Sequence, residues 1–260
     1  MSTAGLDINI LGPAFLAGLL VISTHVPLGR QVLKRGIIFI DLAVAQIAGV
    51  GVIAAHSFGW AHSPVTVQLV AFTTALTGAL TLYFVERRWP DIQEALIGTS
   101  FVLSATAGII ILAHHPHAGE YLKELLAGQI LWVDTSQLWI IGALYAVVLI
   151  LWFGFRGHAK PLLFYLLFAA TVTASVQLVG VYLVFASLII PALVVRNINS
   201  PWGLAIAYGV GTAGYGSGLA ASAIFDLPAG AVIVWTLALT GSLAAIVIAK
   251  LNKNPLPHDE

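Results

Sequence analysis

The chain has 260 residues, of which 59% are hydrophobic and 8% are charged, and its mean hydropathy is +0.97. A soluble domain carries about 25% charged residues, so this composition indicates a polytopic membrane protein. The formal net charge of zero gives no sign of nucleic-acid binding, and the absence of cysteine excludes disulfides, thiolate metal sites and redox dithiols. Because no polar stretch is long enough for a soluble domain, we expect any ATPase, kinase or receptor domain on another chain.

The chain opens with an apolar run, Ile8–Val26, that has no basic region before it and no cleavage site after it. It predicts a retained helix rather than a signal peptide. A spanning helix needs about 20 mostly apolar residues. Runs of this kind lie at Ile8–Gly29, Gly36–His56, Pro64–Val85, Ala95–Ala113, Gln137–Phe155, Trp202–Phe225 and Ala229–Ala249.

A further stretch, Pro161–Val195, holds no charged residue and is too long for one crossing. It predicts two tightly connected helices that turn near Gln177–Gly180. The expected fold class is therefore an all-α polytopic membrane helix bundle with about nine crossings, the tight hairpin included. Residues 1–251 are expected to form a single transmembrane domain, and residues 252–260, which are polar and contain two prolines, a disordered cytoplasmic tail.

The basic residues indicate the orientation, because lysine and arginine concentrate on the cytoplasmic side. With the N-terminus outside and the C-terminus in the cytoplasm, every lysine and arginine except Lys123 falls on the cytoplasmic side. The same map places these histidines on the outer face: His56, His62, His114, His115 and His117.

The outer segment between His117 and Gln137 shows helical spacing of apolar residues. Tyr121, Leu122, Leu125 and Leu126 share one side, opposite Lys123 and Glu124. This pattern predicts an amphipathic helix that lies at the outer interface or re-enters the membrane.

Asp41 lies inside the second apolar run, where a charged side chain costs roughly 2.5–3.5 kcal/mol on insertion scales. The helical positions that share its face are Ala45, Ala48 and Gly49, so another helix or a narrow cavity can approach closely. Two readings follow. Asp41 is either a ligand or gate on a cation path, or a structural acid that hydrogen-bonds a neighbouring helix or is protonated in place.

His25 and Asp41 are expected at similar depth, roughly 8–9 Å from the cytoplasmic helix ends at 1.5 Å per residue. If the first two helices are neighbours, the pair would suit zinc, manganese or iron, or would form a plain hydrogen bond. Gln46 is about 140° from Asp41 around the helix and is expected to face elsewhere.

Two features on the outer side each allow a metal-binding and a purely structural interpretation. Asp226, in the stretch SAIFDLPAG, is either a cap on the last helix or a metal-facing carboxylate at the outer mouth. His114, His115 and His117 form a histidine-rich loop, which is either a metal-collecting or docking surface or merely solvated.

Several stretches, in order and over nearly the whole chain, resemble the permease subunits of zinc/manganese/iron-type ABC transporters. They are VPLGRQVLKRGIIFIDLAVAQIAGVGV, EALIGTSF, YLKELLAGQILWVDTSQL, QLVGVYLVFASLIIPALVVR and SAIFDLPAG. The resemblance implies a homodimer of permeases in the bacterial cytoplasmic (inner) membrane, with cytoplasmic ATP-binding subunits and an external metal-binding protein. It implies no resident cofactor, no enzymatic activity on this chain, a transported divalent metal ion, and metal-path roles for Asp41 and Asp226.

The chain departs from the family pattern in two places. Ala45 stands where the family commonly has a histidine one turn after the helix-two acid, so His25, or Gln46 after a local shift, is the candidate substitute. Only Arg156–Lys160 separates two apolar runs where the family usually has a longer segment that docks on the ATPase.

Three functions remain open at this point. The first is the permease subunit of an ATP-driven importer, with zinc favoured by the outer histidines ahead of manganese or iron. The second is a stand-alone, proton-coupled secondary metal carrier, which the short cytoplasmic segment favours. The third is a structural or receptor-like membrane component without a path.

Overall fold

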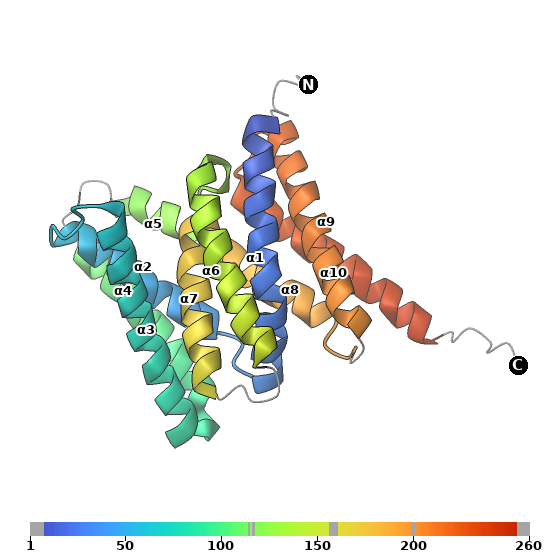
Figure 1. Cartoon of the computed structure of the whole chain (residues 1–260), viewed down its shortest axis with the longest axis horizontal. Coiled ribbons are helices and arrows are strands. Elements are labelled where there is room, and N and C mark those ends of the chain that lie inside the picture. The colour runs from blue at the N-terminus through green and yellow to red at the C-terminus, as the bar shows by residue number, and fades with distance from the viewer. Residues whose placement is uncertain (1–7, 114, 116–117, 156–160, 199–200, 254–260) are drawn as a thin grey trace, which may run out of the picture.

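The computed structural model describes residues 8–113, 115, 118–155, 161–198 and 201–253, and all regular structure in these ranges is helical (Figure 1). The α-helices are α1 (Ile8–Arg35), α2 (Ile40–Ser57), α3 (Pro64–Arg88), α4 (Gln93–Leu112), α5 (Ala118–Ala127), α6 (Thr135–Gly154), α7 (Pro161–Val179), α8 (Val181–Val194), α9 (Pro201–Phe225) and α10 (Ala229–Lys253). Two short 3-10 helices, η2 (Pro90–Ile92) and η3 (Ile130–Trp132), precede α4 and α6.

Seven of the described helices are long and apolar enough to cross a membrane, which confirms the helical membrane fold expected from the composition. They are α1, α2, α3, α4 together with η2, α6, α7 and α10. α8 has 14 residues and is about 21 Å long, short of the ~30 Å hydrocarbon core. α9 has 25 residues but is rich in glycine, and it is not among the seven. The nine crossings and the orientation of the termini therefore stay predictions, and Arg156–Lys160 lies outside the described residues.

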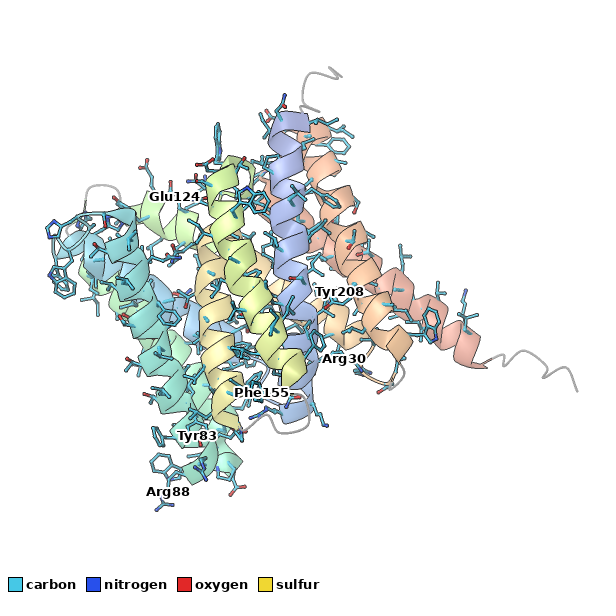
Figure 2. All side chains as sticks on the ribbon, viewed as in Figure 1. Arg30, Tyr83, Arg88, Glu124, Phe155 and Tyr208 are labelled. Atoms are coloured by element: carbon cyan, nitrogen blue, oxygen red, sulfur yellow. The ribbon has the colours of Figure 1, made fainter. Side chains whose placement is uncertain are left out.

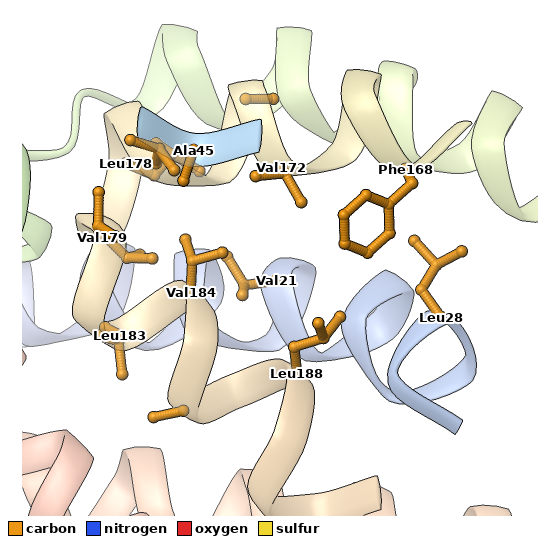
Figure 3. Packing of buried hydrophobic residues seen from close by; sticks show 14 of the residues in the cluster. Val21, Leu28, Ala45, Phe168, Val172, Leu178, Val179, Leu183, Val184 and Leu188 are labelled. Atoms are coloured by element: carbon orange, nitrogen blue, oxygen red, sulfur yellow. The ribbon is translucent and has the colours of Figure 1, made fainter. Parts of the chain in front are cut away.

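α7 is the central helix, and most of its residues are buried. It packs against α2 and α3 on one side and against α1, α6 and α8 on the other (Figure 1). Figure 3 shows Phe168 and Val172 of α7 facing the apolar side chains of α8 and α1, Leu28 among them. The expected turn after α7 is present at Gly180, whose φ of 79° is a backbone conformation that glycine adopts without strain. The chain changes direction there, and α8 runs on against α1 and α10.

The start of α2 is held by polar contacts from three other helices. Nη1 of Arg35 donates to both carboxylate oxygens of Glu86, at 2.9 and 3.1 Å, and the guanidinium lies 4.6 Å from the ring centre of Phe164. The backbone N–H of Phe39 donates to Oε1 of Glu94 at 3.2 Å. These contacts tie the α1–α2 connection to α3, α4 and α7.

Candidate functional site

Asp41 lies in the first turn of α2 and is 1% exposed. Neither carboxylate oxygen has a hydrogen-bond partner within the part of the chain that the structure describes. A buried carboxylate without hydrogen bonds is stable only when it takes up a proton or meets a cation. Among the described residues no neighbouring helix hydrogen-bonds the Asp41 side chain, which leaves two readings, an acid protonated in place and a group that binds a cation.

The residues that follow Asp41 on its face are small and buried. Ala45 and Gly49 are one and two turns further along α2, so the three positions form one row of about 12 Å at 1.5 Å per residue. Figure 3 shows Ala45 of α2 beside Leu178 of α7. The row thus runs from Asp41 along the core side of α2, as expected from the sequence.

His25 on α1 is fully buried. Its Nδ1 lies 2.8 Å from the carbonyl oxygen of Val21, and because a carbonyl only accepts, Nδ1 carries the proton. An imidazolium buried without a hydrogen-bond partner for Nε2 would be costly, so the ring is neutral and Nε2 is an unprotonated acceptor with no partner among the described residues. A neutral imidazole with one free ring nitrogen is the form that binds a metal ion.

No hydrogen bond joins His25 and Asp41 in this structure. α2 packs mainly against α3 and α4, whereas α1 packs mainly against α8 and α9, and α7 contacts both α1 and α2. Of the two alternatives for this pair, the plain hydrogen bond is wrong, since His25 Nε2 and both Asp41 oxygens lack a hydrogen-bond partner, and the shared metal stays a prediction. Gln46 is buried on another face of α2. Within the described ranges, no three side chains of the His, Asp or Glu type come together as metal ligands.

A cavity of about 400 Å³ opens at the end of the bundle opposite the Arg35–Glu86 pair. His56 from the end of α2 and His115 flank the ring of Tyr121, with ring centres 6.1 and 6.3 Å away. Glu124, one turn further along α5, also lines the cavity, and Figure 2 shows it at the end of the bundle away from Arg88. Further polar lining comes from Ser57, Gln129, Gln137 and Gln177. The cavity therefore offers imidazole, carboxylate and amide groups to a cation.

The remaining sequence candidates lie apart from Asp41 or outside the described residues. Asp226 is exposed at the turn between α9 and α10, where its φ is 52°, and it does not line the cavity. His115 lines the cavity, while His114 and His117 lie outside the described residues.

Sequence reasoning missed Glu124 and the glutamines as lining residues. The amphipathic pattern of α5 was the available signal, but it located the helix and not the cavity beneath it.

Comparison with known proteins identifies relatives over nearly the whole chain. The sequence profile of the ABC 3 transport family matches residues 7–162 and 154–248. An uncharacterized membrane protein of Synechocystis is 29% identical over 93% of this chain and 90% of its own length. The manganese transport system membrane protein MntC of Halalkalibacterium halodurans is 25% identical over 92% of this chain and 87% of its own length. In fold, the chain resembles a solved structure, PsaBC from Streptococcus pneumoniae in complex with Fab, with a TM-score of 0.75 at 20% identity over 94% of this chain and 95% of that one.

Proposed function

Because the chain belongs to the ABC 3 transport family, we propose that it is the membrane-spanning permease subunit of an ATP-driven importer of divalent metal ions. The observation that carries the proposal is Asp41, a buried acid in a spanning helix whose two oxygens have no partner among the described residues. The metal is the transported substrate, and ATP is bound and hydrolysed by partner chains. The name of the manganese transport relative supports metal as the substrate class.

The proposed path begins at the outer cavity and runs along α2. A hydrated cation enters among His56, His115 and Glu124, loses water, and moves down the row of small residues to Asp41. His114, His117 and Asp226 serve at the outer mouth. His25 completes the Asp41 site in a state of the cycle that brings α1 and α2 closer, or Gln46 does so after a local shift of α2. Alternating access then releases the ion on the cytoplasmic side.

Nitrogen and oxygen donors decide the proposed metal preference. The chain has no cysteine, so its donors are imidazole, carboxylate and amide groups. Imidazole suits zinc and iron, of which zinc generally binds more tightly, and a site with more carboxylate oxygens suits manganese. We therefore propose zinc as the cargo, ahead of manganese and iron.

The proposed assembly is a homodimer of this chain in the bacterial inner membrane. Cytoplasmic ATP-binding subunits drive it, and an external metal-binding protein delivers the ion. The PsaBC fold likeness agrees with a permease that works in a complex. The segment that receives the ATPase is not assigned, since Arg156–Lys160 lies outside the described residues.

Purification from native membranes followed by reconstitution tests the proposal. We expect an ATP-binding chain to co-purify, and zinc uptake into liposomes to require ATP and to survive collapse of the proton gradient. Uptake by the chain alone that disappears with the proton gradient would instead establish the secondary carrier and contradict the proposal.

A further inference from the structure

The first turn of α2, which carries Asp41, has no side-chain cap of its own. The first N–H groups of a helix have no acceptor within the helix, and a polar side chain at the N-cap commonly accepts from one of them. Here the N-cap is Phe39, which makes no side-chain cap hydrogen bond. Ile38 and Phe39 are also 37% and 48% exposed, so packing holds them only in part. The turn that carries Asp41 therefore depends on an acceptor from another helix.

Glu94 of α4 is that acceptor. The backbone N–H of Phe39 donates to Oε1 of Glu94 at 3.2 Å. In a capping box, a glutamate or glutamine inside the same helix accepts from the N–H of the N-cap residue. In this chain an acid on the neighbouring helix makes the equivalent bond. Because Asp41 is two residues after Phe39, the bond acts on the turn that holds the Asp41 carboxylate.

Glu94 is itself held by the packing of α4. The preceding side chain, Gln93, is buried, and its Nε2 donates to the hydroxyl oxygen of Tyr165 on α7 at 3.0 Å. Ile97, one turn further along α4, is fully buried, and α4 packs closely against α2. Oε2 of Glu94 is buried and has no hydrogen-bond partner among the described residues. The carboxylate is thus held by α4 and directed to the start of α2.

We propose that Glu94 is a positioning residue for metal transport, which holds the first turn of α2 so that the Asp41 carboxylate can bind the ion. Glu94 acts through α2 and does not itself bind the metal. The proposal rests on the function proposed above, since it takes Asp41 as a metal ligand. Groups that orient a metal ligand from outside typically change metal affinity about 10–100-fold when they are removed.

Glu94→Ala tests the proposal in the complete complex with its ATP-binding chains, through two measurements. Hydrogen exchange, followed by mass spectrometry without zinc, reports on the peptide that covers residues 36–44. We expect its amides to exchange about tenfold faster, because the start of α2 loses its acceptor. ATP-driven zinc uptake into liposomes is measured against zinc concentration. The concentration for half-maximal uptake should rise about tenfold or more, with a smaller change in the maximal rate.

Two further variants separate the hydrogen bond from the charge and from general damage. Glu94→Gln keeps an acceptor oxygen at the same place, so both measurements should stay within about threefold of the unchanged chain. Asp91→Ala is the matched control, since Asp91 is an exposed acid in η2, in the same connection between α3 and α4. The proposal is overturned if Glu94→Ala leaves either measurement unchanged. It is also overturned if Glu94→Gln is as impaired as Glu94→Ala, or if Asp91→Ala has the same effect.

The positioning role and the proposed function fail in distinguishable ways. If Glu94→Ala speeds exchange at the start of α2 while Asp41→Asn still transports zinc at the full rate, the hydrogen bond holds α2 but Asp41 is not on the metal path, and the proposed function fails. If Asp41→Asn stops transport while Glu94→Ala changes neither exchange nor half-maximal uptake, the metal path stands and the positioning role is refuted.

Discussion

The ion pair between Arg35 and Glu86 fixes the start of α2, and its strength can be worked out from the structure. The two side chains are 15% and 24% exposed, so the pair lies between two known limits. Breaking a fully buried pair costs about 3–5 kcal/mol, whereas an exposed pair contributes about 0–1 kcal/mol. We expect Glu86→Gln to lower the free energy of unfolding by about 1–3 kcal/mol, because it leaves the guanidinium partly buried and without its counter-charge.

A double-mutant cycle separates the pair from other effects of the same residues. Arg35→Met removes the charge and the contact with the Phe164 ring, and the double variant with Glu86→Gln should show a coupling energy of about 1–2 kcal/mol. The free energies are measured by denaturant unfolding in mixed micelles. Arg88→Met is the control, because Arg88 is exposed on the same helix and should couple to Glu86→Gln by less than about 0.5 kcal/mol. A coupling energy near zero for Arg35 would refute the reasoning that this pair holds α2 in place.

Two further predictions concern the core. Gly180→Ala should destabilise the fold by more than about 1–2 kcal/mol, because alanine at a φ of 79° bears that cost and its methyl group would meet the backbone of Gly128. Gly98→Ala is the control and should not destabilise the fold, because the space around Gly98 is open. Thermal unfolding compares the two variants. Phe168→Ala should lower the free energy of unfolding by about 3–5 kcal/mol, because the ring is fully buried. Phe84→Ala, at a position 63% exposed, should lower it by about 1 kcal/mol or less. Equal losses for the two variants in denaturant unfolding would contradict the packing described.

Hydropathy predicted the helices well because each spanning segment is apolar along its whole length. The ends of α2, α3 and α6 lie within a few residues of the expected runs, and the break at Gly180 falls inside the expected turn. The amphipathic segment after His117 forms α5 as expected. α8 has 14 residues and is too short to cross the bilayer alone, although the sequence predicted a crossing there. Most of its residues are buried against other helices, and a buried apolar helix has the same composition as a lipid-facing one.

The sequence did not predict which helices pack against one another. In a membrane both lipid and protein surroundings are apolar, so periodicity does not reveal which face meets another helix. Whether His25 could reach Asp41 was left open by the sequence for this reason, and the structure shows no hydrogen bond between the two side chains. The contact of Leu125 with Gly49 joins segments far apart in the chain. Hydropathy could not predict it, because hydropathy does not report the space that a glycine leaves for the side chain of another helix.

The central claim is that Asp41 binds the transported metal, and ATP-driven zinc uptake by the reconstituted complex tests it most directly. Asp41→Asn keeps the shape of the side chain and removes its charge. We predict a loss of uptake of at least about 10–100-fold, the range found when even an outer partner of a metal ligand is removed, with unchanged assembly and unfolding temperature. Asp134→Asn, at an exposed acid that caps α6, should transport normally. Full uptake by Asp41→Asn at normal levels in the membrane would contradict the claim.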